Sequence, residues 1–185
     1  MTISPGQAAA ALEDIERTER KTRTARGYAE ASPYLVLWGL VWIVGYGGCA
    51  VLPREQWGLV WLPLIVVGAI GSIWLGSRGR GESRPGSLGR AGLITLSIGI
   101  FIGSVYYVFR PTDAAPYLIF PTLIAGLVYS LAGILARMPR FVWIAAGMFV
   151  LTMAGYVAAP QWTAIWVGAA GGGGLVLGGL WLRKV

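Results

Sequence analysis

Apolar residues in this chain fall into six long runs separated by short polar segments. The runs lie at 34–52, 57–76, 91–109, 117–136, 141–158 and 162–182, and none contains Lys, Arg, Asp or Glu. A helix needs about 20 apolar residues to cross the ~30 Å hydrocarbon core of a bilayer. We therefore predict an all-α, polytopic bundle of six transmembrane helices spanning residues 34–182.

The connections between the runs are short, which favours antiparallel neighbours and three successive helical hairpins. The first and third hairpins share a pattern. Gly45-Tyr46, Pro53 and Gln56-Trp57 in the first correspond to Gly155-Tyr156, Pro160 and Gln161-Trp162 in the third. This similarity suggests an internal repeat, although hairpin duplication alone does not indicate transport.

A charged segment precedes the first run and has the features of a helix. Ser4-Pro5-Gly6-Gln7 resembles a capping box with Pro at the first helical position. Three acid–base pairs have i,i+4 spacing in the favourable order: Glu13–Arg17, Glu16–Arg20 and Glu19–Arg23. Gly27 can end this helix, and Ser32-Pro33 can serve as a linker. We predict a helix over residues 5–26, within an N-terminal cytoplasmic helix and linker of residues 1–33.

The basic residues are distributed unevenly between the two sides of the predicted bundle. Thirteen of the 15 Lys and Arg residues lie in the N-terminal segment, in the loops after the second and fourth runs, and in the tail 183–185, whereas only Arg54 and Arg110 lie on the other side. Basic loops stay in the cytoplasm. We predict a multi-pass protein of the bacterial cytoplasmic (inner) membrane with both termini cytoplasmic. The net charge of +7 is then mainly a topological signal, which argues against nucleic-acid binding.

Residues for catalysis are scarce. The chain has no histidine and a single cysteine, Cys49. It has no nucleophile–base set, no zinc-binding spacing and no phosphate-binding loop. We expect neither an enzyme nor a cofactor or metal site.

Small residues with helical spacing predict close helix contacts, because glycine lets backbones approach in lipid. The candidate packing positions are Gly99, Gly103, Gly168, Gly172, Gly174 and Gly178. A glycine-lined path or a contact in a homo-oligomer is the alternative role for these positions.

Aromatic residues deeper in the runs are candidates for lining an apolar cavity or a pore. They are Trp38, Trp42, Tyr46, Tyr106, Tyr107 and Tyr129. Tryptophans nearer the run ends, including Trp143, Trp162 and Trp181, are typical of an interfacial aromatic belt. For the tyrosines, hydrogen bonding between helices is the competing interpretation.

The N-terminal helix is either a solvated stalk that lies on the bundle or a docking helix for a cytoplasmic partner or for a second copy of itself. Its narrow apolar stripe and its basic residues are candidates for docking a cytoplasmic protein: Leu12, Ile15, Arg17, Arg20 and Arg23. The first hypothesis is a membrane-embedded regulatory or interaction protein that uses residues 5–26. The alternative is a channel or facilitator for a small neutral solute. Coupled ion transport is disfavoured, because intramembrane charges usually carry it.

The whole pattern resembles small bacterial six-span membrane proteins that begin with a charged cytoplasmic helix. The resemblance rests on the N-terminal charged run, on Ser32-Pro33 followed by Trp38-Gly39 and Gly45-Tyr46, and on Gly171 to Gly174 ahead of Leu182-Arg183-Lys184. It implies no particular activity.

Overall fold

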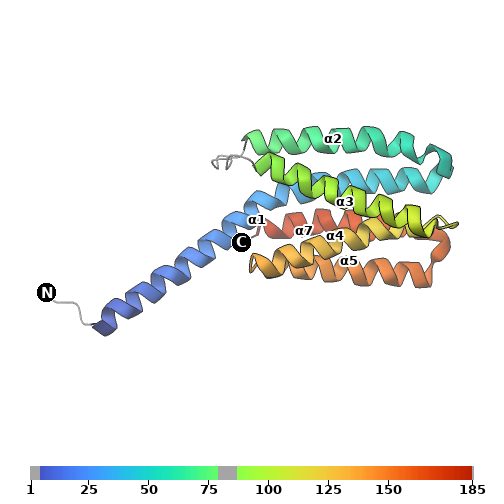
Figure 1. The fold of residues 1–185 in the computed structure, drawn as a ribbon. Coiled ribbons are helices and arrows are strands. Elements are labelled where there is room, and N and C mark those ends of the chain that lie inside the picture. The colour runs from blue at the N-terminus through green and yellow to red at the C-terminus, as the bar shows by residue number, and fades with distance from the viewer. Residues whose placement is uncertain (1–4, 79–86, 185) are drawn as a thin grey trace.

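The computed structural model describes residues 5–78 and 87–184, and these form a bundle of long helices (Figure 1). Six helices are long and apolar enough to cross a membrane. The bounds are α1 Pro5–Val51, α2 Trp57–Arg78, α3 Ser87–Phe109, α4 Ala115–Leu135, α5 Pro139–Ala158, and a sixth span built from α6 Thr163–Val167, a π-helical turn Gly168–Gly173 and α7 Gly174–Leu182. The described chain contains no β-strand. The all-helical fold class is confirmed, and the chain is a multi-pass membrane protein.

One end of the bundle carries most of the described basic residues, and we call it the basic end. There α2 finishes at Arg78, α5 begins beside Arg140, and α7 is followed by Arg183. The C-terminus lies at this end, and the first half of α1 projects away from it (Figure 1). We call residues 5–26 the projecting segment. Ser4 of the predicted capping box, and Arg80 and Arg84 of the second loop, lie outside the described residues.

Helix α1 is continuous over 47 residues, so the predicted helix end at Gly27 and the linker at Ser32-Pro33 are wrong. Gly27 lies against Met138: a Cβ at this glycine would be 3.0 Å from the Met138 Cε. The glycine therefore serves a close contact rather than a helix end. Proline inside a helix removes a hydrogen bond and costs about 3 kcal/mol. Buried contacts of Tyr28, Ser32 and Leu35 offset that cost.

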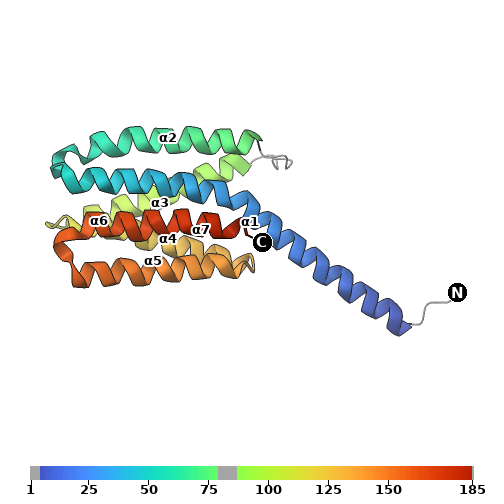
Figure 2. The ribbon, with the colours of Figure 1, turned by 180° about the vertical axis from the view of Figure 1, so that it is seen from behind.

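The core of the bundle forms where α1, α4, α5 and the sixth span meet. Seen from behind, the sixth span lies between α1 and α5 (Figure 2), and it contacts both. Met148 of α5 and Leu175 of α7 are each only 1% exposed. Thr122 of α4 and Thr152 of α5 are completely buried. Helix packing around the sixth span therefore holds this half of the molecule together.

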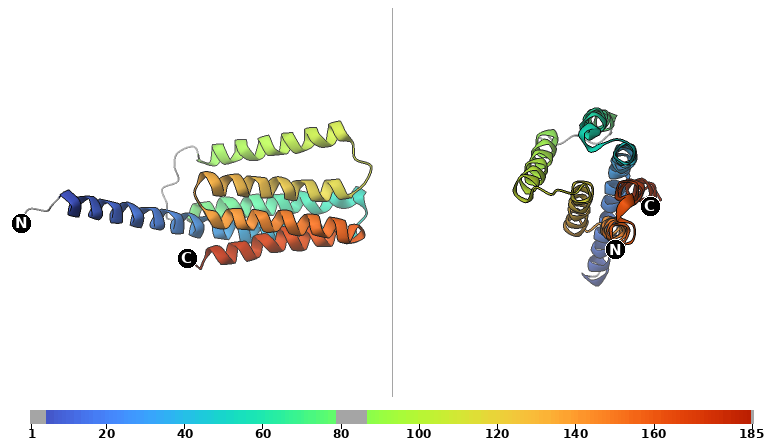
Figure 3. Two further views of the ribbon diagram at one scale, coloured as in Figure 1. Left: turned by 90° about the horizontal axis from the view of Figure 1, so that it is seen from below. Right: turned by 90° about the vertical axis from the view of Figure 1, so that its right-hand side faces the viewer.

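Helix α3 lies at the periphery (Figure 3). None of the residues Gly92–Phe109, its most apolar stretch, is buried. Its contacts to α4 run through aromatic rings, with centroid distances of 6.2 Å for Phe101–Phe120 and 4.5 Å for Tyr106–Tyr117. Most of α3 is thus left for lipid.

Candidate functional site

The main polar cluster lies at the basic end, where α1 leaves the bundle. The Ser32 hydroxyl donates to the Gly179 carbonyl at 2.7 Å and accepts from the Arg183 Nε at 2.9 Å. Ser32 is completely buried, so its bond to the Gly179 carbonyl is shielded from water, whereas Arg183 is exposed. Because Ser32 belongs to α1 and the other two to the end of the sixth span, these bonds join the two helices. We call this cluster, together with Tyr28 and Arg140, the basic-end junction.

Arg140 and Tyr28 tie α5 into the same junction. The Arg140 backbone N–H donates to the Tyr28 hydroxyl at 3.1 Å, and the Arg140 Nη1 donates to the Trp181 carbonyl at 2.8 Å. The last carbonyls of a helix lack partners within it, so this guanidinium caps α7. The Tyr28 ring lies 6.0 Å from the Phe141 ring. Helix α5 and the end of the sixth span therefore fix the direction in which α1 emerges.

The projecting segment is largely exposed. Leu12 is 61% and Ile15 55% exposed, and Arg17, Arg20 and Arg23 are exposed as well. Of the three predicted ion pairs, Glu16–Arg20 forms at 3.0 Å, and a further pair, Arg26–Glu30, forms at 2.8 Å. The other two predicted pairs do not form among the described residues.

Three aromatic candidates lie on α1, namely Trp38, Trp42 and Tyr46. They fill helix contacts instead of lining a cavity. Trp38 donates its indole N–H to the Ser72 hydroxyl at 3.1 Å, and its ring lies over Gly68. Tyr46 is 2% exposed and donates its hydroxyl to the Leu118 carbonyl at 3.0 Å. Trp42 packs edge-on against Tyr46, with 5.7 Å between the ring centroids.

Among the tyrosine candidates of the middle helices, Tyr106 binds the α4 carbonyl next to the one that Tyr46 binds. Tyr106 donates to the Tyr117 carbonyl at 3.3 Å, the carbonyl that Pro121 leaves without its helical partner. Tyr129 stacks on Phe141 at 5.9 Å, and Tyr107 is 72% exposed. The six aromatic candidates therefore do not form one site.

The predicted packing glycines divide into two groups. Those of the sixth span face neighbouring helices: a Cβ on Gly172 would be 2.8 Å from the Gly39 carbonyl oxygen, one on Gly178 2.8 Å from Ile144, one on Gly168 3.1 Å from Tyr46, and one on Gly174 3.7 Å from Met148. For Gly99 and Gly103 the expectation is wrong, because no described atom lies within 4 Å of a Cβ at either position. Within residues 5–78 and 87–184, helix α3 has no neighbour on that face.

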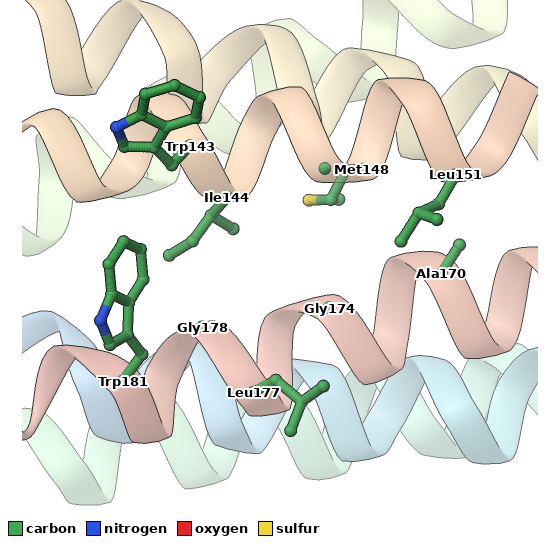
Figure 4. A pocket seen from close by; sticks show the side chains of 10 residues that line it. Trp143, Ile144, Met148, Leu151, Ala170, Gly174, Leu177, Gly178 and Trp181 are labelled. Atoms are coloured by element: carbon green, nitrogen blue, oxygen red, sulfur yellow. The ribbon is translucent and has the colours of Figure 1, made fainter.

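A groove opens on the surface between α5 and the sixth span (Figure 4), with a volume of about 270 Å³. It is lined by apolar and small residues, among them Trp143, Met148, Leu151, Ala170, Gly174 and Trp181. None of the predicted aromatic candidates lines it. Among the predicted glycines, Gly174 and Gly178 do.

Sequence reasoning missed the basic-end junction and this groove. The sequence pattern places Ser32 in a linker and gives Arg140 and Arg183 only a topological role. The placement of Trp143 and Trp181 at the ends of their runs was the one available signal for the groove. In the described part of the chain, no three His, Cys, Asp or Glu residues gather in a way that could hold a metal ion.

Searches of protein families, curated proteins and solved structures found no match to this chain.

Proposed function

We propose that this chain is an interaction or regulatory protein of the bacterial inner membrane, which presents residues 5–26 to a cytoplasmic protein partner. The observation that carries the proposal is the continuity of α1. One helix runs from the core of the bundle through the basic-end junction into the projecting segment. A docking helix held this way binds without first losing the freedom to swing, which lowers the entropy cost of association.

The basic asymmetry supports the cytoplasmic placement. The basic end carries Arg78, Arg140 and Arg183, whereas Arg54 and Arg110 lie at the other end. Because basic loops stay in the cytoplasm, we infer that both termini and the projecting segment face the cytoplasm. Impermeant thiol labelling at engineered Ser77→Cys and Asp113→Cys would test this. Labelling of residue 113 alone in intact cells is the expected result, and labelling of residue 77 alone would refute it.

The exposed stripe of the projecting segment supports a protein partner. Leu12 and Ile15 lie one turn apart on one helix face, and each is more than half exposed. Helices in water gain most of their stability from packing an apolar face. A partner that covers Leu12 and Ile15 would therefore stabilise the segment as it binds.

A matched pair of double variants tests the docking face. Leu12→Ser with Ile15→Ser removes the stripe, whereas Asp14→Ser with Lys21→Ser changes two exposed residues on the opposite face and keeps the net charge. A photocrosslinker at position 19 should yield one defined adduct in cells. The first variant should abolish the adduct and the second should keep it. Equal yields from both variants would contradict docking through this stripe.

The channel alternative has less support from the geometry. Trp38, Tyr46 and Tyr106 each pack against a neighbouring helix through a hydrogen bond. The described groove opens sideways between α5 and the sixth span. A flux of urea or glycerol into proteoliposomes well above that of empty liposomes would restore the channel hypothesis.

A further inference from the structure

The groove between α5 and the sixth span has the shape of a site for a single hydrocarbon chain. Its open side lies on the outer surface of the bundle, and its walls are apolar (Figure 4). It runs along the helices from Trp143 and Trp181 at the basic end to Leu151 and Ala170. At 1.5 Å per residue, the distance from Trp143 to Leu151 is about 12 Å. Half of a ~30 Å hydrocarbon core is about 15 Å, so the groove covers most of one leaflet.

The end of the groove that lies farthest from the basic end is closed. Beyond Leu151, the Trp166 indole N–H donates to the Leu151 carbonyl, and the Trp166 ring lies directly over Gly155. Gly147 is a groove-lining residue, and no described atom lies within 4 Å of a Cβ at this position. A chain entering from the basic end thus meets open space beside Gly147 and ends near Trp166.

Arg140 lies beside the end of the groove that Trp181 lines. The Arg140 guanidinium lies 4.9 Å from the centroid of the Trp181 ring, and Trp181 lines the groove. Only one of its five N–H donors is needed for the bond to the Trp181 carbonyl. From residue 114 to residue 185 the sequence has no Asp or Glu, and its charged side chains are Arg137, Arg140, Arg183 and Lys184. No acidic side chain of this half competes for Arg140.

We propose that this groove binds an anionic phospholipid from the leaflet at the basic end, with one acyl chain beside Gly147 and the phosphate paired with Arg140. Basic pockets between transmembrane helices on the cytoplasmic side are typical sites for anionic headgroups. Arginine also suits phosphate, because its planar N–H groups bind two oxygens at once. The indoles of Trp143 and Trp181 lie at the boundary between chain and headgroup, where tryptophan is favoured.

Native mass spectrometry of the full chain tests this site. The protein is reconstituted in vesicles with equal amounts of dioleoylphosphatidylglycerol and dioleoylphosphatidylcholine, extracted in mild detergent, and its retained lipids are counted. We expect one phosphatidylglycerol per chain. Since a basic residue near an anionic surface contributes about 1 kcal/mol, the preference over phosphatidylcholine should be about fivefold. Equal retention of the two lipids would overturn the proposal.

Two matched pairs of variants locate the lipid. Gly147→Leu fills the groove, whereas Gly99→Leu adds the same side chain to an equally open position on α3. Only Gly147→Leu should remove the lipid from the folded, monodisperse fraction. Arg140→Gln should abolish the preference for phosphatidylglycerol and Arg140→Lys should keep most of it. Arg78→Gln is the control, because Arg78 also covers a tryptophan, Trp74, at 3.7 Å, but on α2.

Three results would contradict the proposal. If Gly147→Leu retains phosphatidylglycerol as well as Gly99→Leu does, the chain does not lie in the groove. If Arg78→Gln and Arg140→Gln lower the preference equally, the effect is one of net charge and not of a site. If millimolar glycerol phosphate displaces the lipid, Arg140 binds a free anion and the acyl groove contributes nothing.

Discussion

The sixth span and helix α3 carry glycines with the same four-residue spacing and use them in opposite ways. In the sixth span, Gly172 faces the Gly39 carbonyl of α1 so closely that a Cβ would come within 2.8 Å of it. On α3, Gly99 and Gly103 have open space beside them among the described residues. Small-residue spacing permits close approach of backbones, but a second helix must be present to make the approach. The molecule therefore has a tightly packed half, built on α1 and the sixth span, and a loosely attached helix, α3.

The largest expected effect is a clash at the tight contact. Gly172→Leu places a side chain against the Gly39 carbonyl and the backbone nitrogen of Ile43, which cannot move aside as a flexible side chain could. We expect a loss of about 3 kcal/mol or more, at the upper end of overpacking effects. The matched change Gly103→Leu on α3 should alter stability by less than about 0.5 kcal/mol, as at other exposed positions. Thermal unfolding in detergent measures both. Equal losses of stability in the two variants would contradict the difference in packing between the sixth span and α3.

The next effect concerns Trp166, which lies in α6 near the start of the sixth span. Its ring packs on Gly155 and its N–H binds the Leu151 carbonyl, so it joins α6 to α5. Because truncating a packed tryptophan leaves a cavity, Trp166→Ala should cost about 2–3 kcal/mol. Trp74→Ala on α2, where the ring is 50% exposed, is the control. A Trp166→Ala protein as stable as the Trp74→Ala protein would mean that Trp166 is only an anchor.

The smallest effect tests the attachment of α3. Tyr106→Phe removes the hydroxyl that binds the Tyr117 carbonyl but keeps the ring against Tyr117. One hydrogen bond contributes about 0.5–1.5 kcal/mol, so the global unfolding free energy should fall by about that amount. Hydrogen exchange in α4 around Pro121 should rise, whereas Tyr107→Phe, at an exposed position, should leave it unchanged. A rise in hydrogen exchange with Tyr107→Phe but not with Tyr106→Phe would mean that the Tyr106 hydroxyl does not attach α3 to α4.

The spans were predictable from the sequence because each depends on a local run of apolar residues. The predicted 117–136 and 141–158 correspond to Ala115–Leu135 and Pro139–Ala158. The continuity of α1 was not predictable in this way. Gly27 and Pro33 are unfavourable within helices in local terms, and the contacts that override them come from residues far along the chain. Ser32 and Gly179, for example, are 147 residues apart.

The candidate sites were less predictable for the same reason. Aromatic residues at helical spacing can line a cavity or fill a contact, and only the neighbouring helix decides which. Tyr46 fills a contact because Leu118 of α4 lies beside it. The groove depends on the distance between α5 and the sixth span, and on a π-helical turn at Gly168–Gly173 that glycine content alone does not specify.

The basic-end junction should hold the projecting segment in a fixed direction. Pulsed electron paramagnetic resonance between spin labels at Thr18 and Ile134, both exposed, measures this directly in a Cys49→Ala background. We expect a single narrow distance distribution that broadens when Ser32→Ala removes the hydroxyl that binds both Gly179 and Arg183. A broad distribution in the protein with Ser32 intact would contradict it.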